Sequence, residues 1–254
     1  GFTAGGGYDA YARLMAKHMG NHIPGEPALV PKNMAGAGSR KVTGYIYSVA
    51  PKDGASLATA DQSQALQQAM GDPTIQFDVR KLVWIGNPNK DVNTTAVWAT
   101  SGIKSLEDAK KRDVVVGATG SNTSAQYPQA MNYFLGTKFQ IINGYPGGND
   151  INLAMERGEV TGRGSNAWAS WKGTKPDWLR DQSIQILEQD GIDPEPELTK
   201  MGVPQIWSFI KNETDRKAVE LVLSQQLFGR SYVVPPDTNA EAVAILRQAF
   251  TAAM

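Results

Sequence analysis

The sequence predicts an α/β fold with mainly parallel strands. Short apolar runs bounded by glycine, proline and asparagine alternate with segments of helical spacing, a pattern typical of strands joined by crossover helices. At mid-chain the apolar runs 82–86 and 95–99 follow one another without a helix between them, which indicates a passage from one lobe to another. The length of 254 residues allows one large domain or two lobes of ordinary size, and we expect two lobes.

The first lobe is expected to begin with a helix over residues 9–19. Its apolar side chains recur at helical spacing, and Asp9 at its start complements the free amide groups of the first turn. Pro24 and Pro27 cannot continue the helix and indicate a turn. The elements expected after it are a strand at 28–30, a glycine loop at 33–38, a helix through 45–49, a turn at 51–54, and strands at 56–60 and 82–86.

The second lobe is expected to repeat this plan from residue 95. Ser105 and Asp108 have the spacing of a capping box at the start of a short helix. The elements expected beyond it are a strand at 114–116, a helix at 124–135, a strand at 139–142, a loop at 145–150, a helix ending at 157, a strand at 184–187, a surface loop at 189–204 and helices at 205–210 and 214–228. A last strand at 231–234 precedes a helix that starts at a second capping box, Thr238 and Glu241, and still runs at Met254.

The lobe boundaries are expected where the chain passes from the strands and helices of the first lobe to those of the second lobe, and back. Lobe one is predicted to hold residues 1–91 and 231–254, and lobe two residues 92–230. The two crossings predict a hinge near 87–92 and 229–234, about which the lobes can close on a ligand.

The composition excludes several classes of protein. The 25 basic and 25 acidic residues cancel, and no basic stripe with interleaved aromatic residues occurs, so we expect no nucleic-acid partner. No stretch approaches the roughly 20 apolar residues of a membrane span. The absence of cysteine excludes disulfides, thiolate metal sites and a cysteine nucleophile. No signal peptide is visible, but the chain starts abruptly at a strand-to-loop junction, so we expect a processed or truncated N-terminus.

Common enzyme signatures are absent from the sequence. Residues 162–166, with the sequence GRGSN, lack the spacing of a G-x-S-x-G nucleophile elbow, and the first glycine run does not complete G-x-G-x-x-G. No glycine loop is followed by the lysine of a phosphate-binding loop. His18 and His22 would share a helix face, but Pro24 indicates that the helix has ended, so a metal pair is not expected. We expect no catalytic residue, no cofactor and no metal.

Two glycine-rich loops that open onto helix starts are the strongest binding signals. The first comprises Gly5, Gly6, Gly7, Tyr8 and Asp9. Three consecutive glycines exceed what a turn needs, and they allow a ligand to approach the backbone. The second loop carries more polar side chains than the capping of one helix requires; its candidate residues are Thr119, Gly120, Ser121, Asn122, Thr123 and Ser124. Amide groups and helix dipoles at both loops can bind an anion, so two facing loops would form a clamp for a small acid.

Further candidates lie outside these loops. Arg163 stands between two glycines and can hold a carboxylate in a bidentate pair, although a surface arginine fits the sequence equally well. Ser165 and Asn166 follow it in the same uncharged stretch. Gln62 follows a predicted strand, at the sheet edge where ligands bind in parallel α/β folds, and is a candidate pocket wall. Asp61 beside it is expected to cap a helix, because a carboxylate next to an anion is unfavourable.

Taken together, the motifs resemble those of a known family. The first glycine loop, followed by Ala12-Arg13-Leu14, is similar to the P-G-G-x-x-D…A-R-L opening of the tripartite tricarboxylate transporter solute receptors, the Bug family. The other matching segments, in chain order, are Asn33–Gly38, Ala50–Gly54, Tyr145–Gly148, Gly158–Val160 and Val234–Thr238. The resemblance implies a periplasmic receptor with the type II, Venus-flytrap fold. In such receptors the two glycine loops grip the ligand carboxylate, partly through water. The resemblance also makes Tyr145 a candidate ligand contact.

The sequence departs from the family at two points. Ala4 stands where the family has proline, and Arg163 stands in a segment that is usually more acidic and apolar, which suggests a ligand with a second acidic group. The resulting hypothesis is a monomeric, periplasmic solute-binding protein. It would bind a small organic mono- or dicarboxylate, aromatic acids included, and work with membrane transporter subunits. The alternatives are an α/β enzyme that binds a phosphorylated or acidic molecule through its glycine loops, and a ligand-sensing domain without a transport role.

Overall fold

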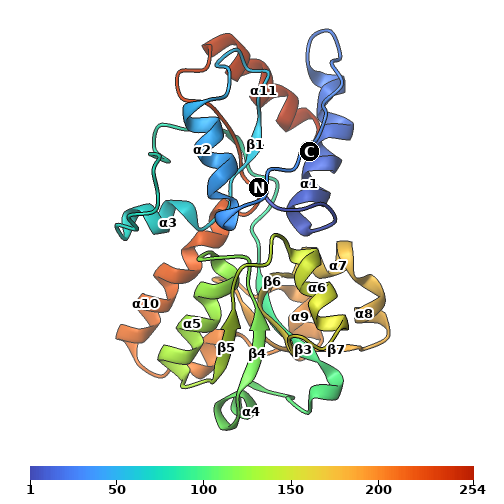
Figure 1. Cartoon of the computed structure of the whole chain (residues 1–254), viewed down its shortest axis with the longest axis vertical. Coiled ribbons are helices and arrows are strands. Elements are labelled where there is room, and N and C mark those ends of the chain that lie inside the picture. The colour runs from blue at the N-terminus through green and yellow to red at the C-terminus, as the bar shows by residue number, and fades with distance from the viewer.

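The computed structural model describes residues 1–254 and consists of two α/β lobes, one above the other (Figure 1). The upper lobe is built on a three-stranded sheet of order β1-β8-β2, and the lower lobe on a five-stranded sheet of order β5-β4-β6-β3-β7. The chain crosses between the lobes twice, between β2 and β3 and again before β8. The predicted α/β class with two lobes is confirmed, while the residue numbers of the lobe boundaries stay a prediction.

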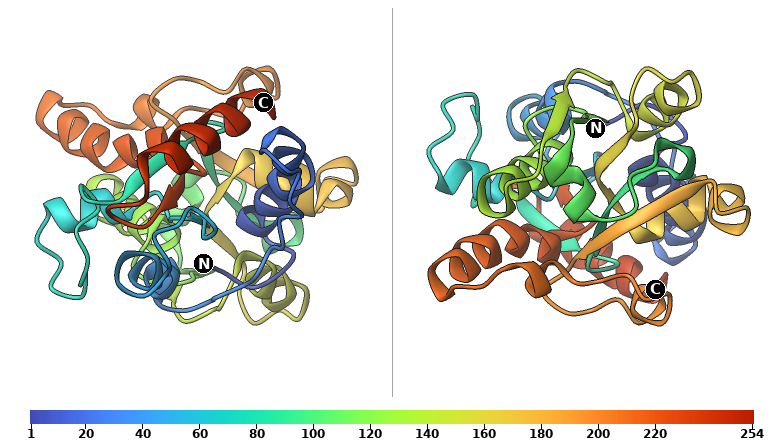
Figure 2. Two further views of the ribbon diagram at one scale, coloured as in Figure 1. Left: turned by 90° about the horizontal axis from the view of Figure 1, so that it is seen from above. Right: turned by 90° about the horizontal axis from the view of Figure 1, so that it is seen from below.

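In the upper lobe, helices pack around a small sheet. The elements are α1 Gly7–Met19, α2 Arg40–Ser48, β1 Ala58–Thr59, α3 Gln64–Ala69, β2 Val83–Gly86, β8 Tyr232–Val234 and α11 Ala240–Ala252, with short 3₁₀ helices at Gly20–His22 and Ala37–Ser39. Helix α11 lies over the lobe beside α1, as the view from above shows (Figure 2). Met15 of α1, Val234 of β8 and Phe250 of α11 belong to one hydrophobic cluster. A Cβ on Gly86 would lie 2.3 Å from the Phe250 ring, so this glycine allows α11 to approach β2.

In the lower lobe, helices cover both faces of the sheet. The elements are β3 Asn93–Trp98, α4 Leu106–Lys111, β4 Val114–Gly117, α5 Thr123–Leu135, β5 Phe139–Ile142, α6 Gly148–Glu156, β6 Gly162–Ala167, α7 Trp168–Thr174, α8 Pro176–Arg180, β7 Ile184–Asp190, α9 Pro196–Lys200 and α10 Glu213–Leu223, with 3₁₀ helices at Ala99–Ser101, Ile206–Phe209 and Ser224–Phe228. One core cluster includes Tyr127 and lies on the α5 and α10 side, and the other includes Trp171 and lies on the α6 and α7 side. The predicted cap of α4 is confirmed, since Ser105 Oγ accepts from the N–H of Asp108 at 3.3 Å.

The prediction of mainly parallel sheets is wrong in one respect, because each sheet contains a reversed strand. In the upper sheet β8 pairs antiparallel with β1 and β2. In the lower sheet β4 pairs parallel with β5 and β6, whereas β3 pairs antiparallel with β6 and β7. Each reversed strand is the one that follows a crossing between the lobes. It enters its sheet from the cleft and runs away from it, while the other strands end at the cleft.

Strand β6 was missed by the sequence analysis. Its sequence, GRGSNA, shows neither alternation nor an apolar run, yet all its residues are buried at the centre of the lower sheet. A Cβ on Gly162 would lie 2.2 Å from the carbonyl oxygen of Ala96, and one on Gly164 would lie 2.6 Å from Pro128. The glycines therefore allow β3 and α5 to pack directly against the strand.

Smaller expectations are also wrong. Residues 28–30 form no strand, because no neighbouring strand pairs with them. The predicted surface loop 189–204 contains the end of β7 and helix α9. The last helix is capped by Asn239, whose Oδ1 accepts from two amide groups, while the hydroxyl of Thr238 donates to a carbonyl oxygen in the preceding turn. This helix ends at Ala252, before the end of the chain. None of the helices combines the length and apolar composition needed to cross a membrane.

Candidate functional site

A polar cavity lies between the two lobes, at the edge where strands of both sheets end. Its empty volume is about 480 Å³, with its open mouth included. Three of its 18 lining residues are hydrophobic, so the cavity suits a small polar ligand better than an apolar one.

Three helices of nine or more residues begin at this cavity. α1 begins after Gly6 and α6 after Gly147, and neither glycine has a side chain to accept from the first amide groups. α5 begins after Asn122, whose Oδ1 accepts from the N–H of Ser124 at 3.2 Å. Gly6, Ser124 and Gly148 line the cavity. Because the free amide groups and positive dipole ends of three helices meet at one place, the cavity favours an anion.

Strand β6 carries the guanidinium of Arg163 into the cavity, where it is buried. Its Nη1 donates to the carbonyl oxygen of Gly148 and to Oδ1 of Asn152, both at 3.2 Å, and its Nε has no partner. Burial, together with the positive charge of Arg230, lowers the pKa of Arg163 to about 9. A buried cation without a counter-ion is costly, so the site is complementary to an anionic group of a ligand.

Arg230 is a second cavity arginine, and the sequence analysis did not identify it. Its Nε lies 2.9 Å from Oδ2 of Asp91 in a buried ion pair, and its Nη2 donates to Ser170 Oγ at 2.9 Å. The guanidinium also lies 4.0 Å from the centroid of the Tyr8 ring. Arg230 and Asp91 stand on the two segments that cross between the lobes, so their ion pair joins the crossings. Because Asp91 neutralises Arg230, the uncompensated positive charge of the cavity is that of Arg163.

The structure brings most of the predicted site residues to the cavity. Those that line it are Gly6, Gly7, Tyr8, Gln62, Thr119, Asn122, Thr123, Ser124, Arg163, Ser165 and Asn166. Those that do not line it are Gly5, Asp9, Gly120, Ser121 and Tyr145. The lining residues that were not predicted as ligand contacts are Phe2, Asp61, Asn93, Gly148, Ala167, Ser170 and Arg230. The sequence contains one indication that Asp61 could line a pocket, namely its place directly after a predicted strand. The other six residues lie outside the two glycine loops, and no pattern in the sequence marked them as ligand contacts.

Asp9 fixes the first glycine loop instead of facing the cavity. Its Oδ2 accepts from the N–H of Gly5 at 3.0 Å and from Arg13 Nε at 2.8 Å, and its Oδ1 accepts from Asn33 Nδ2 at 2.9 Å. Both carboxylate oxygens are therefore used within the upper lobe. Tyr145 is likewise occupied, because its ring packs against the hydrophobic cluster of the lower lobe.

Asp61 lines the cavity and does not cap α3 as the sequence predicts, because the N-cap residue is Ser63 and α3 has no side-chain cap. Its Oδ1 accepts from the N–H of Ser63 at 2.9 Å and from the Ser63 hydroxyl at 2.5 Å. Its Oδ2 accepts a longer bond, 3.3 Å, from Nδ2 of Asn122 in the other lobe. Burial raises the pKa of Asp61, while its hydrogen bonds with Ser63 act in the opposite direction.

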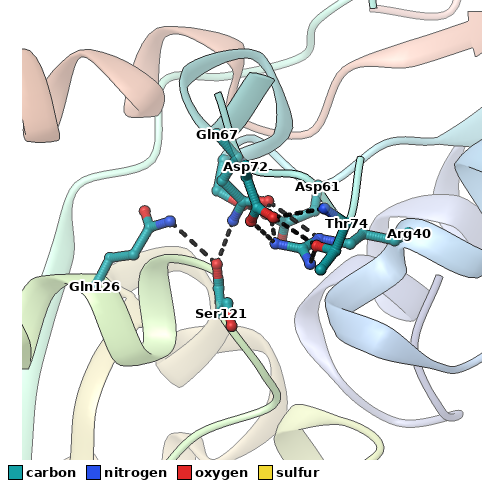
Figure 3. Close-up of polar contacts among 8 residues, drawn as sticks. Arg40, Asp61, Gln67, Asp72, Thr74, Ser121 and Gln126 are labelled. Carbon is teal, nitrogen blue, oxygen red and sulfur yellow. Dashed lines mark hydrogen bonds and ion pairs between the residues drawn. The ribbon is translucent and has the colours of Figure 1, made fainter. Parts of the chain in front are cut away.

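The lobes touch on both sides of the cavity, so this is a closed conformation. On one side Gln67 of α3 donates through Nε2 to the carbonyl oxygen of Ser121 in the lower lobe (Figure 3). On the other side Thr3 Oγ1 donates to Asp150 Oδ2 at 2.5 Å.

The contact between Gln67 and Ser121 is oriented by its neighbours (Figure 3). Arg40 Nη2 donates to Gln67 Oε1 at 2.9 Å and also lies 2.6 Å from Asp72 Oδ2. Because a guanidinium can only donate, it fixes the oxygen of the Gln67 amide toward Arg40 and the NH₂ group toward Ser121. The Ser121 carbonyl also accepts from Gln126 Nε2 of its own lobe at 3.0 Å.

Several buried polar atoms at the cavity have no partner within the protein. They are Gln62 Oε1, Asn93 Nδ2, Arg163 Nε, Ser165 Oγ and Asn166 Nδ2. Buried polar atoms are normally hydrogen-bonded, so their concentration at one cavity indicates the place of a polar ligand or ordered water. No group of three or more histidine, aspartate and glutamate side chains is arranged to hold a metal ion.

Comparison with known proteins gives matches to solved structures. No protein-family model matches the chain, and no curated protein matches it. The structure of R. palustris Rpa4515 with adipate has a TM-score of 0.76 and 18% identity, covering 99% of this chain and 80% of that chain. MatC from Rhodopseudomonas palustris with bound malate has a TM-score of 0.75 and 19% identity, covering 99% and 81%. The periplasmic binding protein BugD has a TM-score of 0.69 and 19% identity, covering 99% and 80%. At these identities the likeness shows the fold, which is the two-lobed fold of periplasmic binding proteins.

Proposed function

We propose that this protein is an extracytoplasmic solute-binding protein of the Bug/TctC type. It encloses a small organic carboxylate between its lobes and delivers it to a tripartite tricarboxylate-type membrane transporter. The observation that carries the proposal is the buried guanidinium of Arg163, which faces the cavity and has no acidic partner in the protein. The helix starts of α1, α5 and α6 add amide donors for the same anion. The fold neighbours solved with adipate and malate support a carboxylate as the ligand class.

The polar lining of the cavity favours polar acids among the possible carboxylate ligands. An aromatic acid would find only Phe2 and Tyr8 as aromatic neighbours, whereas hydroxyl and amide side chains dominate the wall. The rival function, an enzyme acting on a phosphorylated molecule, would use the same helix starts. The fold neighbours are binding proteins, and this favours binding without chemistry.

The test is a thermal-shift and calorimetric panel on the wild type and on Arg163→Met. The panel contains malate, adipate, aspartate, citrate, benzoate and sugar phosphates. An acid at 100 times its Kd should add about 2.7 kcal/mol to the free energy of unfolding, which raises the Tm by roughly 5–10 °C for a chain of this size. Loss of one partner of a buried charge pair costs about 2 kcal/mol or more, so R163M should weaken the best acid at least about 30-fold.

Two measurements separate this effect from damage to the fold. R163M without ligand should be at least as stable as the wild type, because the substitution removes a buried charge that has no counter-ion. Arg180→Met removes an arginine of the lower lobe whose side chain is 72% exposed, and it should leave the affinity unchanged. If sugar phosphates alone shift the Tm, or R163M binds the acid as tightly as the wild type, the proposal is wrong.

A further inference from the structure

Two charges of opposite sign line the cavity without an ion partner in the protein. Arg163 comes from β6 of the lower lobe, and Asp61 follows β1 of the upper lobe. The third charged lining residue, Arg230, is neutralised by Asp91 at 2.9 Å. Asp61 and Arg163 are both buried, at 4% and 7% exposure, and each has only neutral groups as hydrogen-bond partners. Arg230 and the amino group of Gly1 act on Asp61 through their charge, but neither forms an ion pair with it. The protein therefore leaves one buried anion and one buried cation without a direct ion pair on opposite lobes.

Asp61 retains the capacity to accept from a ligand. Its Oδ1 is occupied by the amide and hydroxyl of Ser63, whereas its Oδ2 accepts a long bond of 3.3 Å from Asn122. The Tyr8 hydroxyl acts on the carboxylate less strongly than Ser63 does. A carboxylate oxygen has two lone pairs, so Oδ2 can accept a second and stronger donor from the cavity. A ligand that was purely anionic would instead bring its negative charge into the cavity with Asp61, which is unfavourable.

We propose that the cavity is built for a zwitterion, an amino acid whose carboxylate binds Arg163 and whose ammonium group binds Asp61. The proposal rests on the proposed binding function and names its ligand class. Two arginines and two aspartates, Arg163, Arg230, Asp61 and Asp91, give the buried site no net charge when all are ionised. A ligand with one positive and one negative group keeps that balance and supplies the missing partner of each lobe.

The same arrangement gives the ligand a role in closure. Asp61 belongs to the upper lobe and Arg163 to the lower lobe, and both are buried where the lobes meet. An amino acid bridges the two, so its ion pairs form fully only in the closed state. Differential interaction with one conformation is what a ligand needs to shift an equilibrium toward it.

The experiment compares pairs of acids that differ only in an ammonium group and a hydroxyl group. The pairs are aspartate and malate, glutamate and 2-hydroxyglutarate, serine and glycerate, and alanine and lactate, each titrated calorimetrically into the wild-type protein. The best amino acid should bind at least tenfold more tightly than its hydroxy partner. Asp61→Asn should weaken that amino acid at least tenfold and leave the hydroxy acid unchanged or improved. Asp78→Asn, which alters an upper-lobe carboxylate paired with Arg80 outside the cavity, should change neither affinity.

The possible failures can be told apart. If malate or another hydroxy acid binds as tightly as its amino partner, or only acids without an ammonium group bind, the zwitterion proposal is overturned while the carboxylate-binding function stands. If no carboxylic or amino acid binds, both fall. The comparison of acid pairs uses the wild-type protein, so it decides the question even if D61N does not fold.

Discussion

The acid pair Glu188 and Asp190 on β7 should make the protein less stable as the pH rises toward neutrality. Both side chains are buried, at 0% and 2% exposure, and Glu188 Oε2 and Asp190 Oδ2 have no hydrogen-bond donor within the protein. Glu188 Oε1 accepts from the N–H of Thr95 at 2.9 Å. Burial raises the pKa of Glu188 to about 7 and also raises the pKa of Asp190. The folded protein therefore keeps a proton on this pair that the unfolded chain has already released.

The sign of the pH effect follows from this proton. Between the ordinary glutamate pKa, near 4.5, and the folded value of about 7, the folded state binds more protons than the unfolded state. The free energy of unfolding therefore falls with rising pH in this window and levels off above it. The rise of the Glu188 pKa from 4.5 to about 7 corresponds to a change on the order of 3 kcal/mol in the free energy of unfolding. Glu188→Gln removes the titration of Glu188 and leaves that of Asp190, whose pKa is raised first by its own burial. The amide oxygen of the variant can still accept from the N–H of Thr95, and its NH₂ group can donate to Asp190.

We therefore expect E188Q to match the wild type near pH 4.5 and to become more stable than the wild type by up to about 3 kcal/mol at pH 8. The assay is urea unfolding followed by tryptophan fluorescence at half-unit intervals of pH. Glu197→Gln is the matched control: Lys172 lowers the pKa of Glu197, so this glutamate is already ionised throughout the window and its variant should differ from the wild type by a constant amount. A pH-independent difference for E188Q, or an E188Q protein less stable than the wild type at pH 8, would refute the reasoning.

Two further predictions concern the contact between the lobes and the last helix. Gln67→Leu removes a donor that crosses between the lobes, whereas Gln126→Leu removes a donor to the same Ser121 carbonyl from within the lower lobe. Because one hydrogen bond contributes about 1 kcal/mol, Q67L should shift the ratio of open to closed molecules about fivefold and increase the radius of gyration in X-ray scattering, and an equal change in Q126L would disprove the role. Asn239→Ala should lower the free energy of unfolding by about 1 kcal/mol in urea titrations, and Asn239→Asp should restore most of it; an alanine variant as stable as the wild type would show that the cap contributes nothing.

The parts of the fold that the sequence predicts well are those with local causes. The strand at Val114 and the helix that follows Asn122 are read from an apolar run and a polar cap, and both appear within a residue of the prediction. The place of the second glycine loop could also be anticipated, because it follows β4 and ligands bind at the carboxyl ends of parallel strands. The first glycine loop follows no strand and lies in the other lobe, so the meeting of the two loops depends on how the lobes pack. The ion pair of Arg230 with Asp91 and the strand β6 have no local cause of this kind in the sequence. Arg230 and Asp91 lie far apart in the chain, and their ion pair exists only because the two crossings run side by side.

Strand β6 shows most clearly why the rest of the site escapes a local reading. It contributes Arg163, Ser165, Asn166 and Ala167 to the cavity wall, and its polar composition predicts a loop. A buried strand normally carries apolar side chains. Gly162 and Gly164 carry no side chain, so the backbone of the neighbouring strand and the Pro128 ring pack directly against β6 and bury it. The remaining positions are then free to carry polar groups, whose burial a ligand is expected to compensate. The features that make β6 unrecognisable as a strand are therefore the features that allow it to bind: glycines that let its neighbours pack closely, and buried polar side chains that line the cavity.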